Sequence, residues 1–234
     1  MRYLELTLPD APQNLALDEA LLQEAEAARC PTETLRFWEP QWPVVVVGRS
    51  SRVDLEVHRE ACRQSDVAVL RRISGGAAIV AGPGCLMYAL VLSYQLRPSL
   101  RAIGRAHRFV LNKLAAALGP LVPGVQCVGT SDLAVRDRKF SGNSARCKRS
   151  HVLYHGTLLY DFPLELIDRY LAMPPRQPEY RRQRPHGSFL TNLPLDAATI
   201  RRALIAAWDA TEPRTDWPRE LTSRWAAERY GPLL

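Results

Sequence analysis

The sequence predicts an α+β fold in which a mostly antiparallel β-sheet is flanked by helices. Two observations support this fold class: short β-branched or aromatic runs bounded by proline and glycine, and longer stretches in which apolar residues recur at helical spacing. A tight turn between two of the short runs adds a hairpin, the local unit of an antiparallel sheet. The 234 residues, 47% of them hydrophobic, are enough for one sizeable core, so we expect a single domain over residues 1–234.

The first half of the chain begins with a helix and continues with strands. We expect the helix over residues 12–28, because apolar residues recur every four positions behind Pro12. The strand runs end at prolines or glycines, as at the turn formed by residues 82–84. The strands expected here cover residues 35–38, 44–47, 67–70, 77–81 and 86–94, with a short helix over 56–63.

The second half of the chain mixes both element types. Apolar positions at helical spacing predict a helix over 103–118. Residues 132–135 and 139–141 flank Arg136-Asp137 and form the hairpin candidate. Residues 174–192 form a proline- and arginine-rich connection, which is long enough to be either functional or disordered. The remaining elements are a strand over 152–161, interrupted by a glycine, and helices over 164–171, 197–210 and 218–230.

Composition and charge limit the classes of partner. The net charge is +7, but the basic residues are spread along the chain and no RNP-like aromatic run occurs, so we expect no nucleic acid. An acidic protein or a phosphate-bearing ligand explains the excess charge equally well. No apolar run approaches the length of a membrane span, and we expect no membrane association. Five scattered cysteines without a C-x-x-C pair argue against structural zinc and disulfides, so we expect a cytoplasmic protein.

A first basic block follows a predicted strand and runs Arg71-Arg72-Ile73-Ser74-Gly75-Gly76-Ala77. Its glycines allow the backbone to approach a ligand closely, and its N–H groups and arginines suit an anionic group. We therefore take Arg71, Arg72, Ser74, Gly75 and Gly76 as candidate ligand-binding residues. The alternative interpretation of this block is a tight hairpin turn with surface arginines.

A second basic block contains Lys139 beside a predicted Ser141-Gly142-Asn143 turn, and a later strand presents His155-Gly156. Lys139 is one of only three lysines in an arginine-rich chain, which favours a position where a compact ammonium is needed. Asp132 either pairs with a basic residue or helps to hold Mg²⁺ beside a nucleotide phosphate. His155 is either a hydrogen-bonded core histidine or part of the site. Together the two blocks predict a site for an activated acyl phosphate, which works by charge neutralisation and positioning.

Six segments in this order resemble the catalytic domain of lipoate–protein ligases, within the biotin/lipoate ligase superfamily, over about residues 12–195. The segments are Asn14-Leu15-Ala16-Leu17-Asp18-Glu19-Ala20-Leu21-Leu22, Arg71-Arg72-Ile73-Ser74-Gly75-Gly76, Gly84-Cys85-Leu86-Met87-Tyr88, Ser131-Asp132-Leu133, Arg138-Lys139-Phe140-Ser141-Gly142-Asn143-Ser144 and His155-Gly156-Thr157-Leu158-Leu159. The resemblance implies a fold like that of class II aminoacyl-tRNA synthetases.

The resemblance also implies a two-step reaction. Lipoate and ATP, with Mg²⁺, give lipoyl-AMP, and the lipoyl group passes to a lysine of an acceptor domain. Such acceptors are the E2 component of 2-oxoacid dehydrogenases or the H-type protein of glycine cleavage. Lys139 is then the catalytic residue that contacts the acyl carbonyl and phosphate. The segment from Arg72 to Ala77 lines the acyl-adenylate site, and Asp132 lies by the phosphates.

Four departures from the family pattern define the alternatives. Ala77 replaces a frequent third glycine, Ala81-Gly82 stands where a histidine is frequent, and Ser131 replaces an asparagine. We also expect no C-terminal accessory domain like that of the larger ligases, so a separate accessory subunit is expected as an option. The main alternative is an ATP-independent octanoyl or lipoyl transferase with Cys127 as nucleophile. A second alternative is a noncatalytic basic module that binds RNA or protein.

Overall fold

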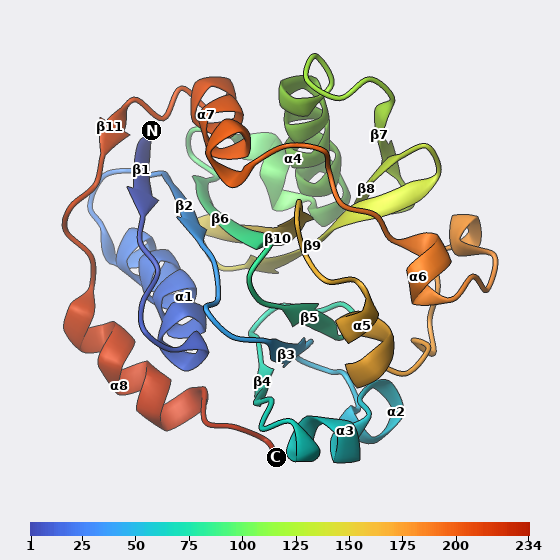
Figure 1. Ribbon diagram of the computed structural model, residues 1–234. Helices are drawn as coiled ribbons and strands as arrows, with labels where there is room; N and C mark the ends of the chain where they lie inside the picture. Colours follow the sequence, from blue (N-terminus) through green and yellow to red (C-terminus); the bar gives the residue numbers. More distant parts are fainter.

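The computed structural model describes residues 1–234 and contains eleven strands and eight α-helices (Figure 1). The strands are β1 (Arg2–Glu5), β2 (Thr34–Trp38), β3 (Val44–Val47), β4 (Val69–Arg71), β5 (Ile79–Ala81), β6 (Cys85–Ser93), β7 (Val125–Val128), β8 (Asp132–Val135), β9 (Arg138–Cys147), β10 (His151–Leu159) and β11 (Glu212–Pro213). The helices are α1 (Ala11–Ala27), α2 (Val53–Glu56), α3 (Arg59–Gln64), α4 (Ile103–Leu118), α5 (Glu165–Tyr170), α6 (His186–Phe189), α7 (Ala197–Ala207) and α8 (Arg219–Arg229), with short 3₁₀ helices η1 (Pro98–Arg101) and η2 (Glu179–Arg181).

Two sheets form the framework, and they confirm the predicted α+β class. The large sheet has the order β11-β1-β2-β6-β10-β9-β8-β7, and the small sheet has the order β4-β3-β5. Pairing in the large sheet is antiparallel from β2 to β7, while β1 pairs in parallel with both β2 and β11. Helix α1 covers one face of this sheet with α8 packed against α1, α4 and α7 cover the other face, and α2, α3 and α5 surround the small sheet (Figure 1). No helix is long and apolar enough to cross a membrane.

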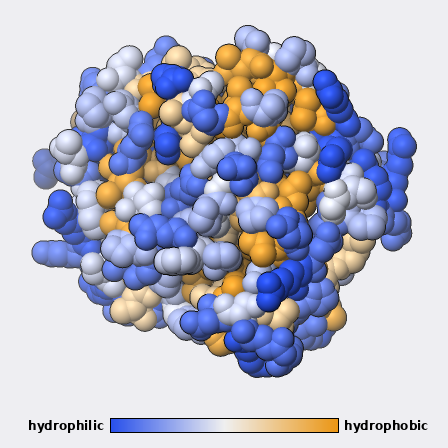
Figure 2. Space-filling view, in the orientation of Figure 1, coloured by the Kyte–Doolittle hydropathy of each residue, from blue (hydrophilic) through white to orange (hydrophobic).

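The core lies on both faces of the central strands. Every residue of β6 and β10 is buried, as expected for strands covered by helices on both sides. One cluster of 26 buried residues joins the small sheet to α5 and α6, and another of 25 lies beneath α4 and α7. Figure 2 shows a largely hydrophilic face in which apolar residues gather in patches, one of them between α5 and α6.

Local signals explain where the long helices begin. The Asp10 side chain accepts a hydrogen bond from the Gln13 backbone N–H at 2.8 Å, and a proline occupies the first turn of α1. The Asp196 side chain caps α7 in the same way, with the Thr199 N–H at 2.8 Å. These caps place both helix starts within one or two residues of the predicted positions.

The predicted Ser141-Gly142-Asn143 turn is wrong, because these residues lie inside β9. The hairpin at Arg136-Asp137 is correct, and both residues have positive φ as a tight hairpin turn requires. Strand β9 then continues to Cys147, with β8 on one side and β10 on the other. The predicted helix over 56–63 is two helices, since Val57 leaves the helical conformation to pair with Leu171. The short strands β1, β7 and β11 were not predicted, and residues 174–192 contain η2 and α6.

Candidate active site

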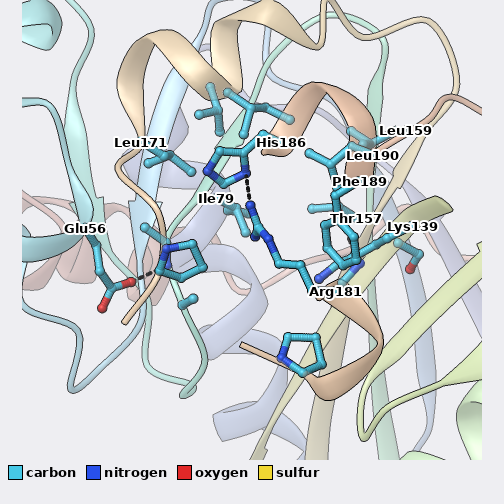
Figure 3. A pocket seen from close by; sticks show the side chains of 18 of the residues that line it. Glu56, Ile79, Lys139, Thr157, Leu159, Leu171, Arg181, His186, Phe189 and Leu190 are labelled. Carbon is cyan, nitrogen blue, oxygen red and sulfur yellow. Dashed lines mark hydrogen bonds between the residues drawn. The ribbon is translucent and has the colours of Figure 1, made fainter. Parts of the chain in front are cut away.

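Two adjoining cavities lie beside the first part of β9, and they share one wall. The apolar cavity, of about 140 Å³, extends beneath α5, α6 and the 174–190 connection (Figure 3). The polar cavity, of about 130 Å³, lies between the first basic block and β9 and β10. The residues common to both cavities are Ala77, Ala78, Ile79, Lys139, Gly142 and Thr157. A ligand with an apolar chain and a polar head group therefore fits this arrangement, with its chain in the apolar cavity and its head group at the shared wall.

The structure brings most of the predicted site residues to these cavities. Those that line one or both are Arg72, Gly76, Ala77, Asp132, Lys139, Ser141, Gly142, His155 and Gly156. Those that line neither are Arg71, Ser74, Gly75 and Cys127. The two basic blocks, 67 residues apart when counted from Arg72 to Lys139, thus form one site.

Lys139 is held in place by a short polar chain. Its Nζ lies 2.8 Å from Asp132 Oδ1, and the Tyr180 hydroxyl donates to Asp132 Oδ2 at 2.7 Å. Burial and the neighbouring Asp132 carboxylate raise the pKa of Tyr180, which keeps the phenol protonated as a donor. The alternative in which Asp132 pairs with a basic residue is therefore the one observed. Both carboxylate oxygens are engaged, so the arrangement does not fit Asp132 as a resident Mg²⁺ ligand. No group of three or more His, Cys, Asp or Glu side chains is placed to hold a metal.

The two arginines of the first block support the loop from within. Arg72 donates to the carbonyl oxygens of Val46, Gly75 and Ala77, at 3.0, 2.6 and 3.0 Å. Burial lowers the pKa of Arg72 to about 10, which still leaves it charged at neutral pH. Arg71 donates to three carbonyl oxygens in residues 48–51. Arg71 and Arg72 were expected to bind a ligand, but in the structure their guanidinium groups bind backbone carbonyl oxygens of the loops. Arg72 also forms part of the polar cavity wall.

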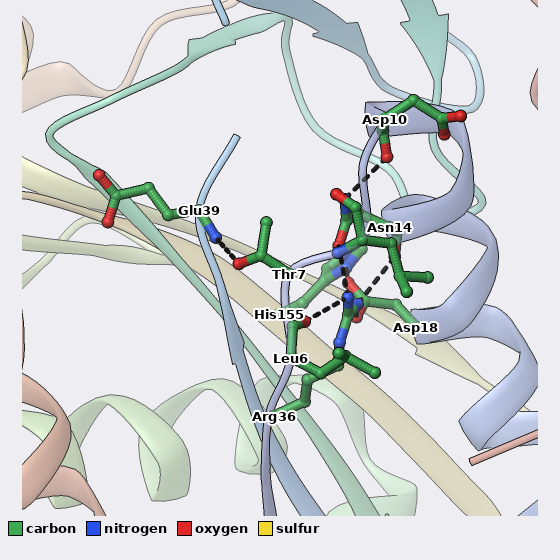
Figure 4. Close-up of polar contacts among 9 residues, drawn as sticks. Leu6, Thr7, Asp10, Asn14, Asp18, Arg36, Glu39 and His155 are labelled. Carbon is green, nitrogen blue, oxygen red and sulfur yellow. Dashed lines mark hydrogen bonds and ion pairs between the residues drawn. The ribbon is translucent and has the colours of Figure 1, made fainter. Parts of the chain in front are cut away.

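His155 connects the loop to α1 and the sheet. Its Nε2 lies 2.5 Å from the Ser74 hydroxyl, and its Nδ1 lies 3.7 Å from Asp18 Oδ2. Asp18 also pairs with Arg36 at 2.5 Å, and all three side chains are buried (Figure 4). His155 thus combines both interpretations, since it is a hydrogen-bonded buried histidine and also lines the polar cavity.

The connection over residues 174–190 supplies site residues that were not predicted individually. Arg181, His186 and Phe189 line the apolar cavity, and Arg181 Nη2 lies 3.3 Å from His186 Nδ1 (Figure 3). Burial is the largest of the effects that lower the pKa of His186, so its imidazole is neutral at pH 7. Glu56 closes another part of the wall by accepting the Ala78 N–H at 2.7 Å. The length and composition of the connection were the only signals of its role.

Cys127 lies on β7, away from the two cavities. Its thiol is 3.4 Å from Asn112 Oδ1 on α4, and it pairs across the strands with Leu133. Leu133 belongs to the core beneath α4, whereas Asp132 beside it faces the polar cavity. Partial burial raises the pKa of the Cys127 thiol, which disfavours the nucleophilic thiolate.

The site can hold an apolar carboxylic acid and offset negative charge at its head. The hydrophobic wall of the apolar cavity suits a chain of methylene groups. Lys139 and the neighbouring backbone of the first block surround the position where the head would lie. The geometry matches acyl activation or acyl transfer, in which charge develops on the carboxyl group.

Comparison with known sequences places most of the chain in one family. Residues 10–204 match the family model described as the lipoyl protein ligase A/B catalytic domain. A probable lipoate-protein ligase A of Mycoplasma pneumoniae is 30% identical over 158 residues, covering 68% of this chain and 45% of that protein. The octanoyltransferase LipM of Oceanobacillus iheyensis is 27% identical over 197 residues, covering 77% and 71%. The chain spans about half the length of the curated ligases that it matches.

Solved structures share the fold. A chain from a bi-partite lipoate protein ligase of Thermoplasma acidophilum, described together with its E2 lipoyl domain, superposes with a TM-score of 0.78 and 22% identity, covering 97% of this chain and 90% of that chain. A lipoate-protein ligase A bound with ATP superposes with a TM-score of 0.76 and 21% identity, covering 97% and 92%. These similarities establish that the chain shares the fold of these proteins.

Proposed function

The chain belongs to the family of lipoyl protein ligase A/B catalytic domains, and from this premise we propose that it is an ATP-dependent lipoate–protein ligase. Lipoate and ATP would form lipoyl-AMP, and the lipoyl group would pass to a lysine of an acceptor domain in the cytoplasm. The observation that carries the proposal is the shared wall of the two cavities, with Lys139 at its centre.

The shared wall supports activation of a carboxyl group at Lys139. The apolar cavity would hold the acyl chain, and the polar cavity would hold the nucleotide part of the intermediate. In the first step a carboxylate oxygen attacks the α-phosphorus of ATP and pyrophosphate leaves. Negative charge gathers on the phosphoryl oxygens, and the Lys139 ammonium offsets it at close range.

Transfer to the acceptor would use the same lysine. The neutral amine of the acceptor lysine attacks the acyl carbonyl carbon, AMP leaves, and the nitrogen gives up a proton to solvent. Lys139 would stabilise the negative carbonyl oxygen that forms during this attack. Asp132 accepts from the Lys139 ammonium and from the Tyr180 hydroxyl, and this chain of contacts keeps the ammonium oriented throughout.

In this proposal Mg²⁺ is bound by the ATP phosphates and has no binding site of its own on the protein. Asp132 is the one carboxylate that lines the polar cavity, and it is already bonded to Lys139 and Tyr180. Mg²⁺ commonly keeps several waters and is held by substrate phosphates with few protein ligands. The proposed role of Asp132 is therefore to orient Lys139.

Two features of relatives support the proposed substrates and partners. One structural neighbour is described with bound ATP, and another is described with an E2 lipoyl domain. We infer that the acceptor is a lipoyl domain of the E2 type or an H-type protein. The description of the second neighbour as bi-partite also supports a separate accessory subunit for this chain.

A second candidate function is an ATP-independent octanoyl transferase with Cys127 as nucleophile. The similarity to the octanoyltransferase LipM favours it, since that similarity extends over 77% of the chain. The position of Cys127 favours the ligase, because its thiol donates a hydrogen bond to Asn112 Oδ1 and the residue lines neither cavity.

Lipoate-dependent exchange between pyrophosphate and ATP tests the ligase proposal in its first step. We expect labelled pyrophosphate to enter ATP only when lipoate is present, without any acceptor. Cys127→Ser should leave this exchange unchanged, because no thiol takes part. A chain that shows no exchange, but transfers octanoyl groups from a thioester donor only while Cys127 is intact, would establish the second candidate instead.

A further inference from the structure

A third concave surface lies behind the first basic block and is lined mainly by arginines. This arginine basin, of about 240 Å³, is formed by Arg49, Arg71, Arg72, Arg146 and Arg229 together with Glu19, Ile73 and Tyr230. Its walls come from the loop after β3, the end of β4, the outer part of β9 and the end of α8. Four separate segments thus bring five guanidinium groups to one surface.

The charges of the basin are not balanced within the protein. Glu19 is its only carboxylate, and its two oxygens already accept from Arg229 and the Tyr230 hydroxyl, both at 2.8 Å. Arg71 and Arg72 donate to backbone carbonyl oxygens and the Ser74 hydroxyl, which carry no net charge. No hydrogen bond or ion pair is formed by the side chains of Arg49 and Arg146. Five cations against one anion make this surface strongly attractive to an acidic ligand.

The basin adjoins the mouth of the polar cavity. Arg72 lines both the basin and the polar cavity. On β9, Ser144 lines the polar cavity and donates to the Gly75 carbonyl at 2.9 Å. Arg146, two residues further on the same strand face, lines the basin, and this spacing along a strand is about 7 Å. A molecule seated on the basin would therefore lie beside the site where the acyl group is activated.

We propose that the arginine basin is the docking surface for an acidic patch of the acceptor protein, and this rests on the proposed function. Guanidinium groups form paired hydrogen bonds with carboxylates, and several on one surface select a partner with clustered Asp and Glu. Arg72 lines both the basin and the polar cavity, so the basin is placed for a protein surface beside the cavity. An acceptor held there would present its lysine to the polar cavity.

Charge reversal at the two unpaired arginines tests this surface. In Arg49→Glu and Arg146→Glu we expect the KM for an apo E2 lipoyl domain of net negative charge to rise roughly tenfold each, with kcat at saturating acceptor nearly unchanged. The lipoate-dependent pyrophosphate exchange should stay at its wild-type rate. Arg105→Glu is the matched control, because Arg105 is exposed on α4 at the opposite face of the sheet. This substitution changes the net charge by the same amount as each test variant.

Binding of the same labelled domain, measured by fluorescence anisotropy, separates this inference from the proposed function. Weaker binding by Arg49→Glu and Arg146→Glu than by Arg105→Glu supports the docking surface, even in a chain that proves inactive as a ligase. Equal binding by all three variants overturns it. A higher KM for ATP with an unchanged KM for the acceptor also overturns it, since the basin would then bind the nucleotide.

Discussion

At the scale of single residues, Lys139 carries most of the proposed chemistry. Its ammonium group lies 2.8 Å from Asp132, which in turn accepts from Tyr180 on the 174–190 connection. The side chain is one-quarter exposed, so a substrate placed in either cavity can reach it. A charge that is already oriented costs little reorganisation when negative charge develops beside it.

Removal of the Lys139 ammonium should therefore be the most damaging single change. We expect Lys139→Ala to lower kcat/KM for lipoyl transfer by at least ~10²-fold, comparable with the loss of one strong electrostatic contact. Lys139→Arg should recover only part of this loss, because the guanidinium is planar and larger. Steady-state kinetics with purified variants of unchanged melting temperature measure both effects. Near-wild-type transfer by Lys139→Ala would remove this residue from the mechanism.

The roles of the arginines show what residue patterns leave open. The sequence predicted one site for Arg72 and Lys139, and both side chains line the polar cavity. It did not predict that Arg71 and Arg72 bind backbone carbonyl oxygens, because the direction of those carbonyls depends on the folded loop. Arg181 and His186 were missed for a related reason, since only the return of residues 174–190 across the cavity brings them to its wall.

At the scale of elements, a buried ion pair joins α1 to β2. Arg36 is fully buried, Asp18 is nearly so, and the Arg36 guanidinium also donates to the Asn14 backbone and side chain (Figure 4). Burial lowers the pKa of Arg36, and Asp18 opposes this effect by favouring the charged form. The pair also positions His155, and through it the Ser74 loop.

Breaking this pair should destabilise the whole fold. Asp18→Ala leaves the Arg36 charge buried and unpaired, so we expect the free energy of unfolding to fall by about 3–5 kcal/mol. Urea denaturation measures the loss. The exposed pair of Arg52 and Asp54 provides the control, and Asp54→Ala should leave the denaturation midpoint nearly unchanged. Similar midpoints for Asp18→Ala and wild type would show that α1 is held by apolar packing alone.

A substitution at Gly142 on β9 tests the position of the Lys139 ammonium separately from the stability of the fold. A Cβ added at this residue would lie 2.9 Å from Lys139 Nζ, so the flexible end of the lysine would have to move. We expect Gly142→Ala to lower kcat/KM by roughly 10²-fold through misplacement of the ammonium. The free energy of unfolding should change by less than about 1 kcal/mol, because only a side-chain end is displaced.

Gly104 gives the matched control for that change. A Cβ at Gly104 would meet no atom within 4 Å, so Gly104→Ala on α4 should keep full activity. Kinetics and urea denaturation of the two variants form one comparison. Full activity in Gly142→Ala would show that the position of Lys139 in the apo protein is not the one used in catalysis.

Strand β9 shows how far local sequence patterns predict an element. The hairpin at Arg136-Asp137 was predictable, because these two residues lie between two strand candidates and set the turn. The extension of β9 through Ser141-Gly142-Asn143 was not, since Ser and Gly favour turns locally. Pairing with β8 and β10 on both sides overrides that preference.

At the scale of the whole molecule, the site is assembled from segments distant in the sequence. The loop after β4, the strands β8, β9 and β10, and the 174–190 connection meet around two cavities with a common wall. The sequence predicted the meeting of the two basic blocks through their motifs. The apolar cavity itself depends on how α5 and α6 pack against the small sheet, which is a property of the tertiary fold.

The mass of an apo acceptor domain tests the central proposal most directly. The purified chain is incubated with lipoate, Mg-ATP and an apo E2 lipoyl domain, with wild type and Cys127→Ser compared side by side. We expect the acceptor to gain the mass of one lipoyl group only when ATP is present, and to the same extent with both proteins. Acyl transfer that needs no ATP, is abolished by Cys127→Ser and leaves an acyl group trapped on Cys127 would contradict the ligase assignment.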